Sequence, residues 1–136
     1  MAPVELLQRV PLFADLDRRE LETLARSFKE RKYQSGDSVA VEGAGAIGFF
    51  VIGEGEATVT VRGDERATLK SGDYFGEVAL IDEGARTATI SAKTDLVCYG
   101  LTAWQFKPLV EGNGQIAWKL LQTLAKRLRS AEQSDN

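Results

Sequence analysis

The sequence predicts a mainly β fold flanked by helices, and three observations support this prediction. Residues 29–101 consist of short β-prone runs separated by glycines. Apolar residues at helical spacing precede and follow this stretch. The length of 136 residues, 43% of them hydrophobic, suits one buried core. We therefore expect a single domain over residues 1–136, with a barrel or sandwich of short strands at its centre.

The N-terminal part, residues 1–28, is predicted to be a helical lead-in. Asp15 and Asp17 are each suited to cap the helix, because a carboxylate accepts hydrogen bonds from the free N–H groups of a first turn. The helix should end near Phe28. The apolar positions that define its buried face are Leu16, Leu21, Leu24, Ala25 and Phe28.

The central part is predicted to contain several short antiparallel strands. The run Thr-Val-Thr-Val at residues 58–61 alternates polar and apolar side chains, as half-buried strands do. Tight turns at glycines separate the runs. The clearest strand segments are 38–42, 48–52, 57–62, 66–69, 87–92 and 96–101.

The C-terminal part, residues 102–130, returns to a helical pattern. Gly112 and Gly114 divide it into helices over 102–110 and 115–130, and the division is a candidate hinge. The polar tail, residues 130–136, is expected to fray. One apolar stripe could either bury against the barrel or pair with a partner chain, and both alternatives stay open. The stripe comprises Ile116, Leu120, Leu124 and Leu128.

Composition excludes several classes of function. The net charge of −3, from 17 basic and 20 acidic residues, leaves no basic field for nucleic acid. No apolar run approaches the roughly 18 residues that membrane insertion needs. The chain has no histidine, which argues against an enzyme and against a metal site. A single cysteine, Cys98, forms no intrachain disulfide, so we expect a reducing cytoplasm.

Residues 72–90 hold the strongest candidate for a binding site. Residues 76–80, Gly-Glu-Val-Ala-Leu, can form a helical turn whose free N–H groups favour an anion. Arg86 adds a positive charge with a planar set of donors that matches a phosphate. Gly76 has no side chain to keep a ligand away from the backbone. These features predict a site for a small phosphorylated sugar.

The same segment resembles the phosphate-binding cassette of the cyclic-nucleotide-binding domain family. That cassette reads Phe-Gly-Glu-x-Ala-Leu, then a short loop, then Arg-(Ala/Ser/Thr)-Ala. This chain has Phe-Gly-Glu-Val-Ala-Leu at residues 75–80 and Arg-Thr-Ala at residues 86–88. Chance agreement at seven such positions is on the order of one in a million over this length. The resemblance extends over essentially the whole chain.

The resemblance implies a fold and a set of ligand contacts. The fold would be an antiparallel double-stranded β-helix, or jelly-roll barrel, over residues 29–101, with an N-terminal helix and C-terminal lid helices. Arg86 would bind the cyclic phosphate, and Glu77 would accept a hydrogen bond from the ribose 2′-hydroxyl. Backbone amides and the hydroxyl of Thr87 would complete the phosphate contacts. The expected ligand-binding residues are Gly76, Glu77, Val78, Ala79, Leu80, Arg86, Thr87 and Ala88.

The base of the nucleotide would be met by the last helix, which acts as a lid in the family. The register of this helix over the pocket is not fixed by the sequence, so several residues stay open as contacts. Stacking, apolar cover and hydrogen bonding are all available among them. The candidates are Trp118, Leu121, Gln122, Ala125, Arg129 and Ser130.

The leading hypothesis for function is a regulatory module that binds cAMP, or alternatively cGMP, and transmits occupancy through movement of its C-terminal helices. We expect no catalytic residue, no metal and no cofactor besides this ligand. The C-terminal helix is the expected route to a homodimer or to an effector. One alternative is a degenerate domain of the same fold that binds a protein partner without a ligand. A remote alternative is a metal enzyme of the cupin type, which normally relies on histidines.

Overall fold

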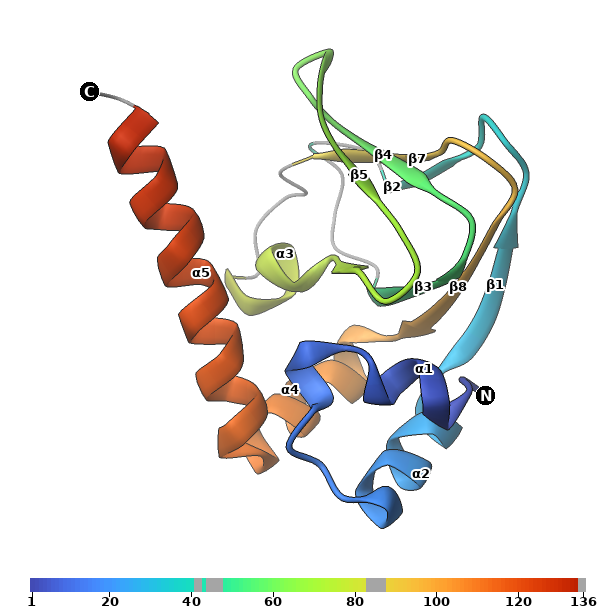
Figure 1. Ribbon diagram of the computed structural model, residues 1–136, viewed down its shortest axis with the longest axis vertical. Coiled ribbons are helices and arrows are strands. Elements are labelled where there is room, and N and C mark those ends of the chain that lie inside the picture. The colour runs from blue at the N-terminus through green and yellow to red at the C-terminus, as the bar shows by residue number, and fades with distance from the viewer. Residues whose placement is uncertain (41–42, 44–47, 83–87, 135–136) are drawn as a thin grey trace.

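The protein is a barrel of short strands with helices packed below it and along one side (Figure 1). This computed structural model describes residues 1–40, 43, 48–82 and 88–134. The predicted class, mainly β with flanking helices, is confirmed. Positions 41, 42 and 87, at the ends of two predicted strands, lie outside the described residues.

The N-terminal helices form a cap on the underside of the barrel. They are α1 (Val4–Gln8), the 3₁₀ helix η1 (Pro11–Phe13) and α2 (Arg18–Ser27). Asp17 caps α2: its side chain accepts a hydrogen bond from the Glu20 N–H, and the Glu20 carboxylate accepts one from the Asp17 N–H. Of the two predicted capping residues, Asp17 performs this role.

Eight strands form two four-stranded sheets among the described residues. One sheet has the order β1-β8-β3-β6 and the other β2-β7-β4-β5, and every pair is antiparallel. Two of the strands, β1 and β6, were not predicted. The strands are β1 (Lys29–Tyr33), β2 (Ser38–Ala40), β3 (Phe49–Glu54), β4 (Ala57–Val61), β5 (Asp64–Leu69), β6 (Tyr74–Phe75), β7 (Thr89–Ala92) and β8 (Leu96–Leu101).

The sheet that contains β3 and β8 is buried on both faces. Phe49 and Val51 of β3 point into the core between the barrel and the helices, whereas Phe50 and Ile52 point into the barrel. This alternation follows from the two-residue period of a strand. The barrel interior is closed by apolar residues of the second sheet. This sheet therefore separates the barrel interior from the core that the helices cover.

The C-terminal helices are α4 (Ala103–Gly112) and α5 (Gly114–Ser134). They meet at Asn113, so the predicted break between Gly112 and Gly114 is confirmed. Figure 1 shows α5 rising beside α3 (Glu77–Asp82) along one flank of the barrel. The predicted fraying from residue 130 is wrong within the described residues, since α5 continues as regular helix to Ser134.

Candidate functional site

A cavity of about 300 Å³ opens at the end of the barrel that faces α3 and α5. Its walls come from both sheets, and its volume lies at the lower end of the range for small-molecule sites. The lining is mostly apolar, with a single acidic and a single basic side chain. The residues that line it are Ala40, Val59, Ala67, Leu69, Tyr74, Phe75, Gly76, Glu77, Val78, Ala88, Ile90 and Arg127.

Gly76 connects the short strand β6 to α3 at the edge of this cavity. Its φ of +100° lies in a region that side-chain-bearing residues rarely adopt. The turn places the first residue of α3, Glu77, over the cavity. The predicted helical turn after Gly76 is therefore present, and the backbone conformation at position 76 favours glycine.

Glu77 is the one charged residue that is buried in the described part of the chain, at 3% exposure. One carboxylate oxygen, Oε1, accepts a hydrogen bond from Arg127 Nη1 at 2.7 Å. The other, Oε2, is also buried but has no hydrogen-bond partner within the described residues. A buried charged acceptor without a partner is costly, so this oxygen is suited to receive a donor from a ligand.

Arg127 brings α5 into the site. It lies on the same helical face as Ile116 and Leu120, which are buried in the core between the barrel and the helices. The spacing from 116 to 120 and 127 keeps all three on one side of a helix with 3.6 residues per turn. Arg127 was missed at the sequence level, because the sequence does not show which face of α5 meets the barrel.

A second polar contact joins α5 to the same edge of the barrel. Thr123, one turn of α5 before Arg127, interacts with the side chain of Tyr74 and lowers the pKa of its hydroxyl. Burial raises the pKa of Tyr74, with a further rise from the neighbouring Glu77 carboxylate, whereas Thr123 and Arg127 oppose the shift. Tyr74 therefore remains a neutral hydrogen-bonding group near neutral pH. The ring of Tyr74 also contacts the ring of Phe49, at 5.4 Å between centroids.

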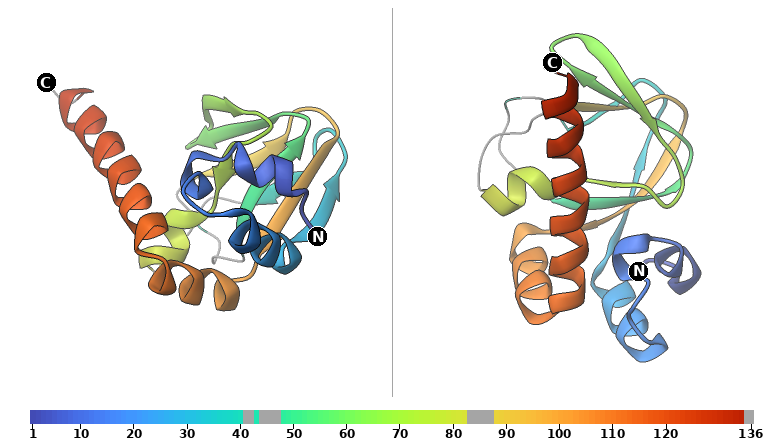
Figure 2. Two further views of the ribbon diagram at one scale, coloured as in Figure 1. Left: turned by 60° about the horizontal axis from the view of Figure 1, so that its bottom comes forward. Right: turned by 60° about the vertical axis from the view of Figure 1, so that its left-hand side comes forward.

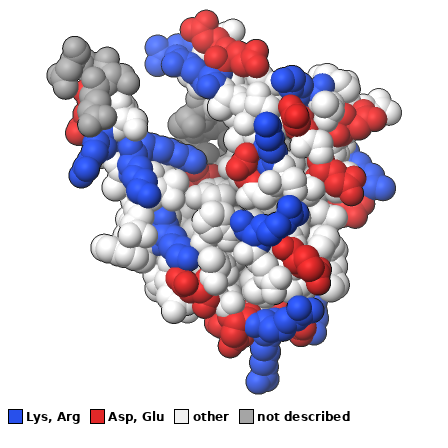
Figure 3. All heavy atoms as spheres, viewed as in Figure 1, with Lys and Arg blue, Asp and Glu red and all other residues white. Residues whose placement is uncertain are grey.

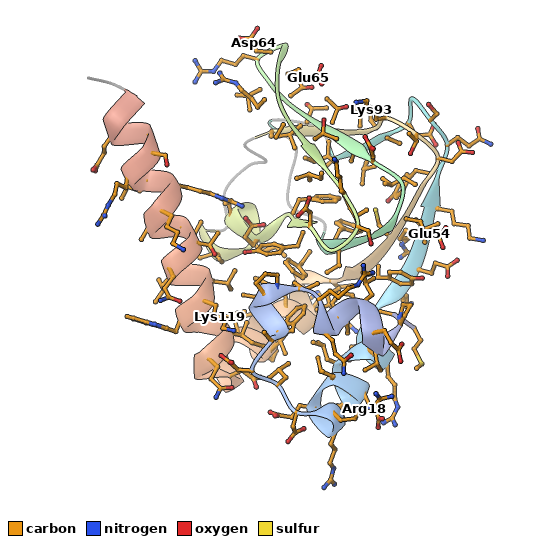
Figure 4. The ribbon with its side chains drawn as sticks, in the orientation of Figure 1. Arg18, Glu54, Asp64, Glu65, Lys93 and Lys119 are labelled. Atoms are coloured by element: carbon orange, nitrogen blue, oxygen red, sulfur yellow. The ribbon has the colours of Figure 1, made fainter. Side chains whose placement is uncertain are left out.

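Lys119 holds the lower part of α5 against the N-terminal helices. Its Nζ donates to the carbonyl oxygen of Pro11 at 3.0 Å and pairs with Asp15 Oδ2 at 3.0 Å. Figure 4 shows Lys119 reaching from α5 toward these helices. Basic side chains follow α5 in the space-filling view, whereas acidic and basic residues mix over the rest of that face (Figure 3). Lys119 and Arg127 of α5 are thus both paired with carboxylates of the protein.

The structure brings together part of the predicted set of ligand-binding residues. Gly76, Glu77, Val78 and Ala88 line the cavity. Leu80 packs instead against the core between the barrel and the helices. Ala79 lies in α3, and nothing further is described of its side chain. The predicted phosphate contacts, Arg86 and Thr87, lie outside the described residues.

The predicted lid residues do not line the cavity in this arrangement of α5. Trp118, Leu121, Ala125 and Arg129 are exposed on the far side of the helix from Arg127. Gln122 lines a neighbouring depression that shares Tyr74 and Arg127 with the cavity, whereas Ser130 belongs to neither lining. The register of α5 gives the physical reason, since the face that meets the barrel carries Arg127. Contact of any of the six with a base stays a prediction.

Metal, membrane-spanning and nucleophilic sites find no support in the described part of the molecule. No group of three or more metal-ligating side chains occurs in the described ranges. No helix within them is long and apolar enough to cross a membrane. Burial raises the pKa of the Cys98 thiol to about 12, which leaves it unreactive as a nucleophile near neutral pH. A larger depression of about 460 Å³ lies between α2 and α4, and it shares no lining residue with the cavity at Glu77.

The barrel, the cavity with its buried carboxylate and the helix that reaches it are the features of a ligand-binding domain. Residues 30–113 match the model of the family described as the cyclic nucleotide-binding domain. The chain belongs to this family, and the resemblance carried by residues 72–90 is confirmed. The family is a regulatory one, and its defining activity is binding rather than catalysis.

Individual relatives agree with this assignment. The chain is 42% identical over 92 residues to a cAMP-dependent protein kinase regulatory subunit of Yarrowia lipolytica, covering 66% of this chain and 24% of that protein. It superposes on a catabolite activator protein of Thermus thermophilus with a TM-score of 0.83 at 29% identity, covering 91% of this chain and 61% of that one. The regulatory domain of Toxoplasma gondii protein kinase A, solved with cAMP, gives a TM-score of 0.80 at 25% identity, covering 90% and 48%. The chain spans about a quarter of the length of the kinase regulatory subunits that it matches.

Proposed function

We propose that this domain binds cAMP in the barrel cavity and reports occupancy through α5. The observation that supports the proposal best is that the two oxygens of the Glu77 carboxylate have different surroundings. Its Oε1 is held by Arg127 of α5, and its Oε2 is buried at the cavity without a partner within the described residues. A ribose 2′-hydroxyl is a donor of the right kind for Oε2.

The apolar walls suit the remainder of such a ligand. Val59, Ala67 and Leu69 line one side of the cavity with aliphatic surface, against which a purine can be desolvated. The anionic phosphate requires a cation, and we assign this role to Arg86 from the sequence pattern, with Thr87 as a second donor. The choice of cAMP over cGMP rests on the named relatives, and Thr87 alone does not decide the base.

The ligand itself can be tested by calorimetric titration with cAMP, cGMP and AMP. We expect cAMP to bind more tightly than AMP, because the open dianionic phosphate of AMP needs a different pocket. Replacing Glu77 by Ala should weaken cAMP much more than 2′-deoxy-cAMP, since only cAMP carries the hydroxyl that the carboxylate would accept. Equal losses for the two ligands would show that Glu77 does not contact the ribose.

The role of Arg86 has its own test. If Arg86 pairs with the cyclic phosphate, Arg86→Ala should cost about 2 to 5 kcal/mol, which is a loss of roughly 30-fold to several thousand-fold in affinity. The matched control is Arg66→Ala, since Arg66 is an exposed arginine of β5 that does not line the cavity. A loss of less than about threefold for Arg86→Ala would contradict the assignment.

The degenerate alternative, a partner-binding domain without a ligand, would require a damaged site. The described part of the cassette instead keeps Gly76 and Glu77 at the cavity. Failure to bind cAMP and cGMP at millimolar concentration would favour that alternative.

The proposal also needs no metal or cofactor, so prolonged dialysis against a chelator should leave the affinity for cAMP unchanged. A loss of affinity that one metal restores would favour the cupin alternative.

The kinase regulatory relatives support an effector protein or domain that responds to α5, and we propose a cytoplasmic location from the single reduced cysteine. We propose no direct contact with nucleic acid or membrane, in keeping with the net charge of −3.

A further inference from the structure

The depression between α2 and α4 is a second cavity of ligand size. Its volume of about 460 Å³ exceeds that of the cavity at Glu77 and lies within the range of small-molecule sites. Figure 2 shows both helices on the underside of the molecule, where α2 leads into β1 and α4 follows β8. We call this depression, which residues of the stretches 16–27 and 101–113 line, the underside groove.

The underside groove is elongated, because residues along the length of both helices line it. Arg19 and Ser27 both line it from α2, and their separation in the chain corresponds to about 12 Å along a helix. Gln105 and Asn113 line it over the same number of residues of α4 and its C-cap. The Gln105 Nε2 donates a hydrogen bond to the carbonyl oxygen of Ser27 at 3.2 Å, which ties the two helices together at one end of the groove. Arg19 lies toward the other end.

The interior of the underside groove is aliphatic. Leu16, Leu24 and Leu101 are its deepest residues, at 9%, 6% and 2% exposure. Leu109 and Pro108 of α4 add aliphatic surface nearer to the solvent. Within the described residues, no aromatic side chain lines the groove. Such a lining removes a hydrocarbon chain from water but offers no ring on which a nucleotide base could stack.

Arg19 is the charged group of the underside groove that is available to a ligand. The other charged lining residue, Glu20, caps α2, since its Oε1 accepts a hydrogen bond from the Asp17 N–H at 3.0 Å. The neighbouring Arg18 pairs with Glu22. The guanidinium of Arg19 has neither an ion pair nor a hydrogen bond within the described ranges. Its planar set of donors matches a carboxylate.

We propose that the underside groove binds a small amphiphilic carboxylate, such as a medium-chain fatty acid. The hydrocarbon chain would lie along the leucines, and the carboxylate would pair with Arg19. An anionic membrane surface would require a cluster of basic residues, whereas the described lining carries one cation and one anion. At the affinity per atom that is usual for small ligands, the dissociation constant is on the order of 0.1 to 1 mM. This binding does not depend on a nucleotide.

Decanoate is a suitable probe, and nuclear magnetic resonance of the backbone amides can locate it on the full chain. As decanoate is added to about 5 mM, the amides that shift should centre on residues 19–27 and 105–113, with a dissociation constant in the range given above. Residues 76–90, which include the cassette, should not shift. Decyltrimethylammonium has the same chain and the opposite charge, and it should bind at least about threefold more weakly.

Two variants of α2 test the head and the chain of the ligand separately. Arg19→Gln should weaken decanoate at least about threefold, whereas Arg26→Gln, at an exposed arginine outside the lining, should not. Thr23 lines the groove, so Thr23→Trp should fill it and abolish binding, with Arg26→Trp as its control. Circular dichroism should show that all four variants remain folded.

Several results would each overturn the proposal. They are an absence of shifts at millimolar decanoate, shifts that centre on residues 76–90, equal binding of the cationic probe, and unchanged affinity in Arg19→Gln or Thr23→Trp.

Discussion

The contact between Arg127 and Glu77 is the link between α5 and the cavity, and its removal gives the sharpest prediction. Arg127→Ala leaves the Glu77 carboxylate buried at 4% side-chain exposure without its cation. At a separation of about 4 Å, two unit charges attract by about 4 kcal/mol at an effective dielectric constant of 20. The Arg127 side chain is 54% exposed, so screening and lost side-chain entropy reduce the net value. We expect a coupling of about 1 to 2 kcal/mol.

A double-mutant cycle measures this coupling directly. The variants are Arg127→Ala, Glu77→Gln and the double variant, each studied by urea and thermal unfolding without nucleotide. Arg127→Ala should lower the melting temperature by about 3 to 8 °C for a domain of this size. The double variant should lose less stability than the two single variants added together, because removal of Arg127 costs little once Glu77 is neutral. Arg129→Ala, on the opposite face of α5, is the control and should change stability by less than about 0.5 kcal/mol.

The same variants connect the contact to binding. If Arg127 positions Glu77 for the ribose, Arg127→Ala should weaken binding of cAMP more than binding of 2′-deoxy-cAMP, which is also the result expected for Glu77→Ala. Additivity of the two single variants within about 0.3 kcal/mol would refute the coupling. If Arg127→Ala still preferred cAMP over 2′-deoxy-cAMP as strongly as the unaltered protein does, the positioning role of Arg127 would be refuted, even with a measurable coupling to Glu77.

Three further predictions follow from buried groups and from backbone conformation. Burial raises the pKa of Tyr33, Tyr74 and Tyr99 above the ordinary value of 10.0. The neutral phenols therefore stabilise the fold below pH 10, and this stability is lost as the pH rises through the raised pKa values. Equal free energies of unfolding at pH 9 and pH 11 would contradict this expectation. Cys98, with a pKa of about 12, should resist iodoacetamide at pH 8 in the native state and react in urea. Gly76→Ala, at a φ of +100°, should cost about 1 kcal/mol or more in stability and also weaken cAMP, and an unchanged melting temperature would argue against the strained turn.

The strands that could be predicted are those whose side chains carry a local signal. The run at residues 58–61 alternates polar and apolar residues, and β4 lies there. The strand β1, Lys-Glu-Arg-Lys-Tyr, has four exposed residues of five and no alternation to recognise. Its strand conformation comes from pairing with β8, which is more than sixty residues away in the chain. Pairing at such a distance leaves no pattern in the local sequence.

The candidate site was predictable to the extent that one segment supplies it. Gly76 and Glu77 lie next to each other in the chain. A glycine followed by a glutamate in this pattern indicates a tight turn and a carboxylate that contacts a ligand. Arg127 comes from another element, fifty residues later. Its participation depends on which face of α5 meets the barrel, and Trp118 and Leu121 offered an equally apolar face. Only the fold decides between those two faces.

The contacts along α5 also locate the part of the helix that a ligand can move most easily. Pulling the lower part away from the barrel would expose Ile116 and Leu120, at about 1.5 to 3 kcal/mol each, and would break the contacts of Lys119 with η1 and Asp15. Beyond Thr123, Arg127 joins α5 to Glu77 at the barrel edge. Rotation of the whole of α5 about Gly112 and Gly114 would break the lower contacts, whereas a bend within α5 near Thr123 would leave them in place. Since the Glu77 carboxylate joins the upper part of α5 to the cavity, a ligand that alters the Glu77 contact acts on the part of the helix that can move without this cost.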